Sequence, residues 1–172
     1  MSKRGTMFLV LTSMFSAMAF ALRKFEILVV RMPIPPLVMD LRGVPVFIGA
    51  CLVPPHYAWF IGWAASEFDL LLEFGVDFTG WIPACVACSL FYKRLKKPLG
   101  KYPILNPLVA MFLGQTIGNL CFLIPFMYFY FKPLSQIPTV LAILFARTML
   151  TFAAAAPIMH AIEKRLGHLI MR

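Results

Sequence analysis

Charged side chains are scarce in this sequence. Only 13% of its 172 residues are Asp, Glu, Lys or Arg, which is about half the share of a soluble globular domain. Hydrophobic residues make up 61% and the mean hydropathy is +0.84, so we expect the chain to lie in a lipid bilayer. Its apolar runs, such as MFLVLTSMFSAMAFAL, are continuous rather than alternating, which favours membrane-spanning helices over a barrel.

Motifs of common catalytic sites are also missing. The sequence contains no glycine-rich phosphate loop, no serine-elbow motif and no metalloprotease helix. Its C-x-x-C motif, Cys85 and Cys88, lies inside an apolar run and has no second pair, so we interpret both thiols as packing residues rather than zinc ligands or redox groups. We therefore expect neither an enzyme nor a site for a metal or cofactor.

The basic residues gather in three clusters. The net charge is +9, and the clusters are Lys3 with Arg4, YKRLKKPLGK and EKRLGHLIMR. Because each cluster borders an apolar run, we interpret them as signals for membrane orientation, with attraction to anionic lipid. This interpretation is preferred over a nucleic-acid surface. The first segment also resembles a cleaved signal peptide, but its apolar run extends to Leu22, which favours a retained helix.

The hydropathy pattern predicts an all-α integral membrane protein. The six predicted spans are 5–23, 41–54, 56–74, 79–93, 104–131 and 136–163. The VPP stretch at 53–55 separates the second span from the third, because proline opposes helix continuation. The second and fourth spans are short for a bilayer. Six spans put all basic clusters and both termini on the cytoplasmic side of the plasma membrane, whereas five would leave one cluster outside.

The join between the first two spans has an unusual composition. Residues 31–50, RMPIPPLVMDLRGVPVFIGA, include four prolines, two arginines and one aspartate. With Arg23 and Lys24, the two arginines would face outward, against the orientation rule. A plain connector needs none of these features, so we interpret the join as a lid over a small-molecule site, stiffened by its prolines.

Polar side chains within the predicted spans indicate a polar interior. Ser66, Asp69 and Glu73 are spaced three and four residues apart and would share one face of the third predicted helix. Arg147 in the last span is the natural cation for one of these acids, because charges inside a membrane pair or face a cavity. Both a structural ion pair and a ligand-binding role fit this pattern.

Further candidates for ligand binding lie in the later spans. Asn119, in the middle of the fifth span, can both donate and accept hydrogen bonds. Trp81 and Tyr128 lie near presumed outer ends of spans, where they would form an interfacial belt or stack on a flat ligand. Arg31 and Arg147 favour a ligand with an anionic group.

Small residues recur at every fourth position along the first span. Ser13, Ala17 and Ala21 form a stripe that allows close approach of another helix. The stripe fits packing inside the bundle as well as docking on a partner membrane protein.

Several stretches resemble the substrate-binding S components of energy-coupling factor (ECF) vitamin transporters. SMFSAMAFALR resembles the family's first helix, whose small-residue stripe docks on a transmembrane coupling subunit, and here Ala17 and Ala21 fill that stripe. DLRGVPVFIGACL, with Asp40, Gly43 and Pro45, is similar to the start of the second helix, and WFIGWAASEFDLL to the third. The family often has Gly-Pro where this chain has VPPHYA.

The resemblance implies a subunit that captures a vitamin from outside and topples in the membrane to release it inward. ATP hydrolysis would be carried out by two separate ATPase subunits. The expected substrate-binding residues are Arg31, Asp69, Trp81, Asn119, Tyr128 and Arg147. Riboflavin, folate, a queuosine precursor and pantothenate all stay open as ligands. Two alternatives also stay open: an assembly or accessory protein with a structural polar interior, and a facilitator that works without ATPases.

Overall fold

The structure is a computed structural model. It describes residues 3–25, 27, 30–31, 38–39, 41–66, 71–95, 104–129 and 133–170. The side chains described are those of these residues other than 3, 30–31, 38–39, 71–76 and 166–170.

Within the described residues the chain forms six α-helices, which confirms the all-helical prediction. The elements are α1 (Lys3–Lys24), β1 (Val30–Arg31), β2 (Val38–Met39), α2 (Gly43–Leu52), α3 (Pro55–Ala65), α4 (Leu71–Leu95), α5 (Leu105–Phe129), the 3-10 helix η1 (Leu134–Gln136) and α6 (Ile137–Ile170). The two short strands pair antiparallel, with Val30 opposite Met39. Proline starts α3, as the VPP stretch predicts.

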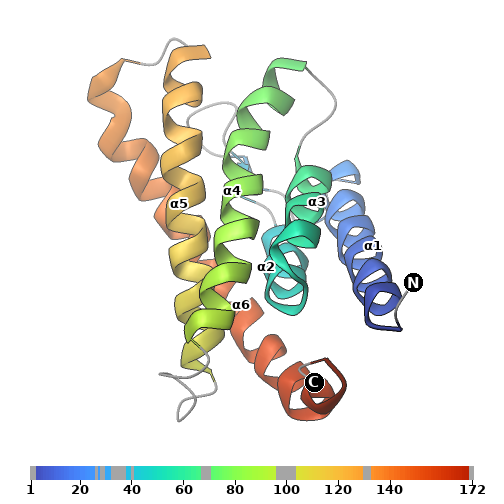
Figure 1. The fold of residues 1–172 in the computed structure, drawn as a ribbon. Coiled ribbons are helices and arrows are strands. Elements are labelled where there is room, and N and C mark those ends of the chain that lie inside the picture. Colours follow the sequence, from blue (N-terminus) through green and yellow to red (C-terminus); the bar gives the residue numbers. More distant parts are fainter. Residues whose placement is uncertain are drawn as a thin grey trace.

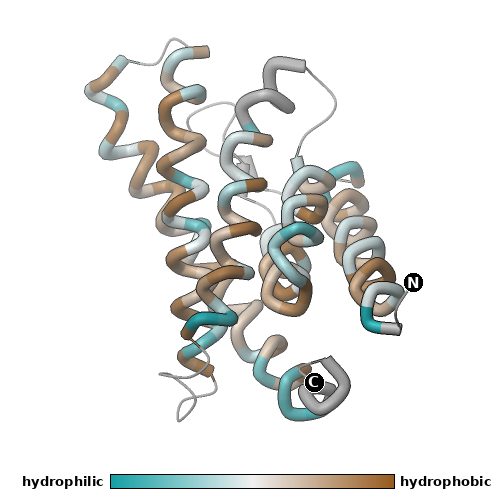
Figure 2. Tube along the Cα trace, in the orientation of Figure 1, coloured by the Kyte–Doolittle hydropathy of each residue, from teal (hydrophilic) through white to brown (hydrophobic). Residues whose placement is uncertain are grey.

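Three helical stretches of the described chain are long and apolar enough to cross a bilayer. They are Arg4–Lys24, Leu105–Phe129 and Leu134–Arg165. Figure 2 shows many hydrophobic residues along α1, α5 and α6, with hydrophilic residues at several helix ends and also midway along α5. This pattern indicates a membrane protein.

The helices alternate in direction between two ends of the bundle (Figure 1). The start of α1, the end of α4, the start of α5 and the end of α6 lie together, and we call this the lower end. The paired strands and the start of α4 lie toward the opposite, upper end. Two exposed basic pairs, Lys93–Arg94 and Lys164–Arg165, belong to the lower end, as does exposed Arg4.

The prediction of a third helix over residues 56–74 is wrong for its second half. α3 ends at Ala65, Ser66 has an extended backbone, and Glu73 belongs to α4. The Arg42 side chain donates a hydrogen bond from Nη1 to the Ala65 carbonyl over 2.8 Å, which satisfies an acceptor that a continuing helix would use internally. Ser66 and Glu73 therefore do not share a helix face, and Asp69 lies outside the described residues.

Because α3 ends early and α4 starts early, the lengths of these two helices differ from the prediction. α4 begins at Leu71 rather than at residue 79 and runs for 25 residues. α2 and α3 have 10 and 11 residues, so each is about 15 Å long, half of the roughly 30 Å hydrocarbon layer. The short helices are therefore the second and third, not the second and fourth.

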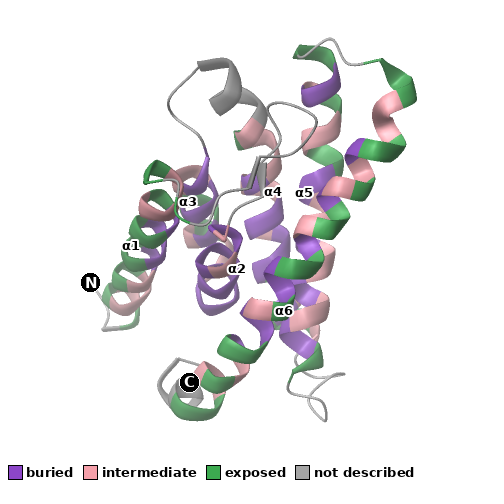
Figure 3. Ribbon diagram, turned by 180° about the vertical axis from the view of Figure 1, so that it is seen from behind, coloured by how far each residue is buried: buried purple, intermediate pink, exposed green. Residues whose placement is uncertain are grey.

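α2 is the central helix of the bundle. All of its residues except Val44 are buried, and Figure 3 shows it enclosed by its neighbours. The Phe47 ring lies 5.5 Å from the Phe152 ring and 6.0 Å from the Trp81 ring, measured between centroids. α2 thus connects α4 and α6 through aromatic contacts.

α4 and α5 pack closely because small residues face one another at four-residue spacing. Gly80, Ala84 and Cys88 on α4 meet Gly114 and Gly118 on α5. A Cβ atom added at Gly118 would lie 2.6 Å from the Gly80 carbonyl oxygen and from the Ala84 Cβ atom. In a bilayer, such close backbone approach is a main source of helix association.

The Gly118→Leu variant tests this contact. The added side chain has no space between the two backbones, so we expect roughly 1–3 kcal/mol of destabilisation and a lower midpoint of thermal unfolding in detergent. Ala146→Leu, at an exposed position on α6, is the matched control and should leave the midpoint unchanged. Equal midpoints for both variants would contradict the close packing of α4 on α5.

Candidate functional site

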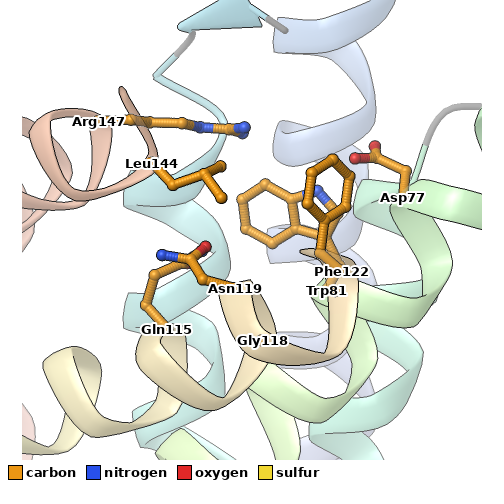
Figure 4. A pocket seen from close by; sticks show the side chains of 9 residues that line it. Asp77, Trp81, Gln115, Gly118, Asn119, Phe122, Leu144 and Arg147 are labelled. Atoms are coloured by element: carbon orange, nitrogen blue, oxygen red, sulfur yellow. The ribbon is translucent and has the colours of Figure 1, made fainter. Parts of the chain in front are cut away.

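A pocket lies between α4, α5 and α6 (Figure 4). It is open to one side, and its empty space of about 280 Å³ includes the solvent at its mouth. Its lining residues are Asp77, Gly80, Trp81, Gln115, Gly118, Asn119, Phe122, Leu144 and Arg147.

Three residues predicted from the sequence to bind substrate meet in this pocket. Trp81 comes from α4, Asn119 from α5 and Arg147 from α6. Trp81 and Asn119 are buried, and the Arg147 Cζ atom lies 5.2 Å from the centroid of the Trp81 ring. The structure therefore brings together an aromatic ring, an amide and a guanidinium group that are far apart in the sequence.

Among the remaining predicted binding residues, Tyr128 has a described side chain, and it is not a lining residue of the pocket. Tyr128 lies near the end of α5 with 75% of its surface exposed, and its ring contacts Phe129 instead. Asp40 and Asp69 lie outside the described residues, as does the side chain of Arg31. Their expected roles stay predictions.

The predicted lid residues Gly43 and Pro45 form the first turn of α2, where both are buried. A Cβ atom at Gly43 would lie 2.8 Å from the Thr151 Cγ2 atom, so glycine allows α2 to approach α6 closely. These residues fix the point at which the chain re-enters the bundle after the paired strands.

The small-residue stripe of α1 faces away from the bundle. Ser13 and Ala17 are exposed and Ala21 is partly exposed, whereas Phe15 and Ala19 are buried against the core. Internal packing is thus supplied by a different face of α1, and the stripe is free to contact lipid or another protein.

The structure adds an ion pair at the pocket wall, between buried Arg42 and partly buried Asp77. The Arg42 Nη1 atom lies 3.0 Å from the Asp77 Oδ2 atom, and the Arg42 Cζ atom lies 5.0 Å from the Trp81 ring centroid. Arg42 is 1% exposed. Two guanidinium groups, Arg42 and Arg147, therefore lie near the ring of one tryptophan. Such a contact is worth about 0.5–1 kcal/mol at an exposed site and about 2 kcal/mol when it is desolvated.

Arg42 supports the pocket without being one of its lining residues. It holds Asp77 and Trp81, which do line the pocket, and it also caps the end of α3 at Ala65. The sequence offers a signal for this role, because the orientation rule leaves the charge of Arg42, directly before an apolar helix, unexplained. Its partner is Asp77. Of the acidic residues in α4, Asp77 is the one whose side chain the structure describes.

A chain of hydrogen bonds orients the amide side of the pocket. The Gln115 Nε2 atom donates to Asn119 Oδ1 over 2.6 Å, and the Asn119 Nδ2 atom donates to Thr148 Oγ1 over 3.4 Å. Thr148 in turn donates to the Leu144 carbonyl over 2.7 Å. The network links α5 to α6 and holds both amide groups at the pocket wall.

The cysteines of the C-x-x-C motif are buried in the core and are free thiols. The Cys88 Sγ atom lies 3.6 Å from the Cys51 Sγ atom on α2. Among the described residues, no group of three or more His, Cys, Asp or Glu side chains is arranged to hold a metal ion. These cysteines act as small residues where α2, α4 and α5 come close together.

Comparison with known proteins gives no relative. No family model, no curated protein and no solved structure matches this chain. Its function must therefore be argued from the pocket and the arrangement of the helices.

The ion pair can be tested by a double-mutant cycle. Arg42→Met and Asp77→Leu should each lower the free energy of unfolding by roughly 3 kcal/mol, because each leaves a charge without its buried partner. The double variant should lose less than the sum of the two single variants. Unfolding is measured thermally in detergent, and strict additivity would contradict the pairing.

Proposed function

We propose that this chain is the substrate-binding membrane subunit of an ATP-driven uptake system of the ECF type. Its substrate is a vitamin or a related micronutrient. The observation that carries the proposal is the convergence of Trp81, Asn119 and Arg147, from three different helices, on one pocket.

The pocket chemistry fits a flat, polar molecule with an anionic group. Trp81 and Phe122 offer aromatic surfaces, and the amides of Gln115 and Asn119 offer donors and acceptors to the edge of a ring. Arg147 supplies a guanidinium group suited to a carboxylate or phosphate. Aromatic surface combined with a small number of polar groups is typical of small-molecule sites.

The position of the pocket supports capture from outside the cell. Asp77 lies in the first third of α4, which begins at the upper end, and the exposed basic residues lie at the lower end. Because positive charge favours the cytoplasmic side, we place the lower end and both termini in the cytoplasm. In this orientation α1, α4, α5 and α6 cross the plasma membrane, whereas α2 and α3 each cover about half of its thickness. The pocket then belongs to the outer half of the membrane.

The exposed face of α1 is the surface on which we expect a partner protein to dock. Ser13 and Ala17 are exposed small residues on a helix long enough to span the membrane, which suits close docking against another transmembrane helix. We assign this face to the coupling subunit. Release of substrate would follow from toppling of the chain, with energy supplied by two separate ATPase subunits.

A second candidate function is supported by the polar network itself. Gln115, Asn119 and Thr148 bond to one another, and Arg42 pairs with Asp77. Polar groups that satisfy each other are also what a membrane assembly or accessory protein with a structural interior would need. Such a protein would bind no small molecule saturably. A facilitator that works without ATPases would use the same pocket.

Mass spectrometry of small molecules released from the detergent-purified, denatured chain separates these functions. We expect one enriched vitamin-like compound at near-stoichiometric amount. Arg147→Gln should weaken its binding by roughly 10–100-fold, the cost of losing a charge-assisted hydrogen bond. Tyr128→Phe, outside the pocket, is the control and should retain the compound. A chain that carries no compound and binds none from a vitamin panel would contradict the transport proposal.

A further inference from the structure

The hydrogen bonds at the amide side of the pocket have a fixed direction. They end on α6 at the Leu144 carbonyl group, which accepts hydrogen bonds and donates none. The Thr148 hydroxyl group has a single proton, and it donates this proton to the Leu144 carbonyl over 2.7 Å. Toward Asn119, the Thr148 Oγ1 atom therefore acts as an acceptor.

This direction decides how the Asn119 amide is oriented. Because Thr148 Oγ1 accepts, the amide nitrogen of Asn119, Nδ2, faces it and donates to it. The amide oxygen, Oδ1, then faces Gln115 and accepts from its Nε2 atom over 2.6 Å. A reversed Asn119 amide would place its oxygen against the acceptor of Thr148, at a site where Asn119 is only 4% exposed, and such a buried mismatch is costly.

Gln115 is the member of this network that remains available to a bound molecule. Its nitrogen is turned toward Asn119, which leaves the Oε1 atom and the second N–H group of Nε2 for a ligand. Gln115 lines the pocket and is partly exposed. The network thus presents a carboxamide to the pocket, and the oxygen of this carboxamide requires a donor from the ligand.

The free edge of Gln115 selects a particular shape of partner. An acceptor and a donor lie side by side on one planar group. The matching partner is a flat edge with an N–H donor beside an acceptor, as in the ring of a lactam, because two parallel hydrogen bonds then form together. Glutamine recognises the edge of adenine in the same way. A ring with acceptors alone would leave Gln115 Oε1 without a hydrogen bond.

The other lining groups agree with this partner. Asp77 lines the pocket from α4 and pairs with Arg42 through Oδ2, so its Oδ1 atom is a second acceptor. Arg147 supplies a positive charge from α6, and Trp81 supplies a flat aromatic surface. The pocket therefore combines acceptors on α4 and α5 with a cation on α6.

We propose that the pocket binds a flat anion with a lactam-type ring edge, whose N–H group donates to Gln115 Oε1 while its anionic group lies toward Arg147. Thr148 is the positioning residue that fixes this donor requirement through Asn119. The inference rests on the proposed function, because it names the substrate class of the same pocket. It disfavours pantothenate, since the open-chain amide of that compound is trans and has its N–H and C=O groups on opposite sides.

The test is calorimetric titration of the detergent-purified full chain with three flat carboxylates. Orotate has lactam edges, its N,N-dimethyl derivative keeps both carbonyl groups but has no ring N–H, and nicotinate has neither group. We expect orotate to bind about 10-fold more tightly than either of the other two, because each of them leaves the Gln115 oxygen without a donor.

Variants of the chain assign this preference to named residues. Gln115→Met keeps the length of the side chain without the carboxamide, so orotate should lose its advantage over the dimethyl derivative. Thr148→Val should reduce the preference severalfold, whereas Thr148→Ser should retain it. Thr116→Val is the matched control, because Thr116 donates to the Phe112 carbonyl over 2.8 Å and is not a lining residue. An unchanged preference in Gln115→Met would overturn the proposal.

The outcomes separate this inference from the transport function. Orotate binding no more tightly than the other two acids would overturn the inference and leave the transport function intact. If none of the three binds, the compound released from the denatured chain decides. A compound with a lactam-type ring edge supports the inference, and one without such an edge overturns it alone. A chain that releases no compound and binds none from the vitamin panel contradicts both proposals.

Discussion

The ion pair between Arg42 and Asp77 is the interaction on which the arrangement of this bundle depends. One guanidinium group ends α3 at the Ala65 carbonyl, neutralises an acid of α4 and lies beside Trp81. It does so from the residue directly before α2, the central helix. A charge buried at this depth persists only with a partner, so the starts of α2 and α4 and the end of α3 must lie together. The pocket forms next to this junction.

The positions of the helices were largely predictable from the sequence, because long apolar runs and proline breaks are local signals. α1, α5 and the break before α3 follow from such signals. The end of α3 was not predictable in this way, because it depends on Arg42, which lies 23 residues earlier in the chain. The close packing of Gly114 and Gly118 on α4 likewise depends on a partner surface that hydropathy does not reveal.

Part of the candidate site was predictable because polar groups are costly inside a membrane and therefore conspicuous in an apolar sequence. This reasoning finds Asn119 and Arg147, and it finds Trp81 from its position in a span. It places Tyr128 near a helix end without showing that its side chain is exposed and lies outside the pocket lining. The sequence shows Arg42 only as a charge that the orientation rule does not explain, since its pairing with Asp77 is a property of the folded chain.

The two ends of the bundle have different chemical characters. The upper part contains paired opposite charges around Trp81, and the described charges at the lower end are basic apart from Glu163. A site for a small polar molecule toward one end and basic residues toward the other would suit a protein that takes up its ligand across the membrane.

The most direct measurement of the central claim is the fluorescence of Trp81 in a chain whose other tryptophans, Trp59 and Trp63, are replaced by phenylalanine. The purified protein is titrated with a panel of vitamins and related micronutrients. A pocket that binds substrate against Trp81 predicts a saturable change at one-to-one stoichiometry for one compound or one chemical class. No change with any compound, in a protein that remains folded, would contradict the assignment of this pocket as a substrate site.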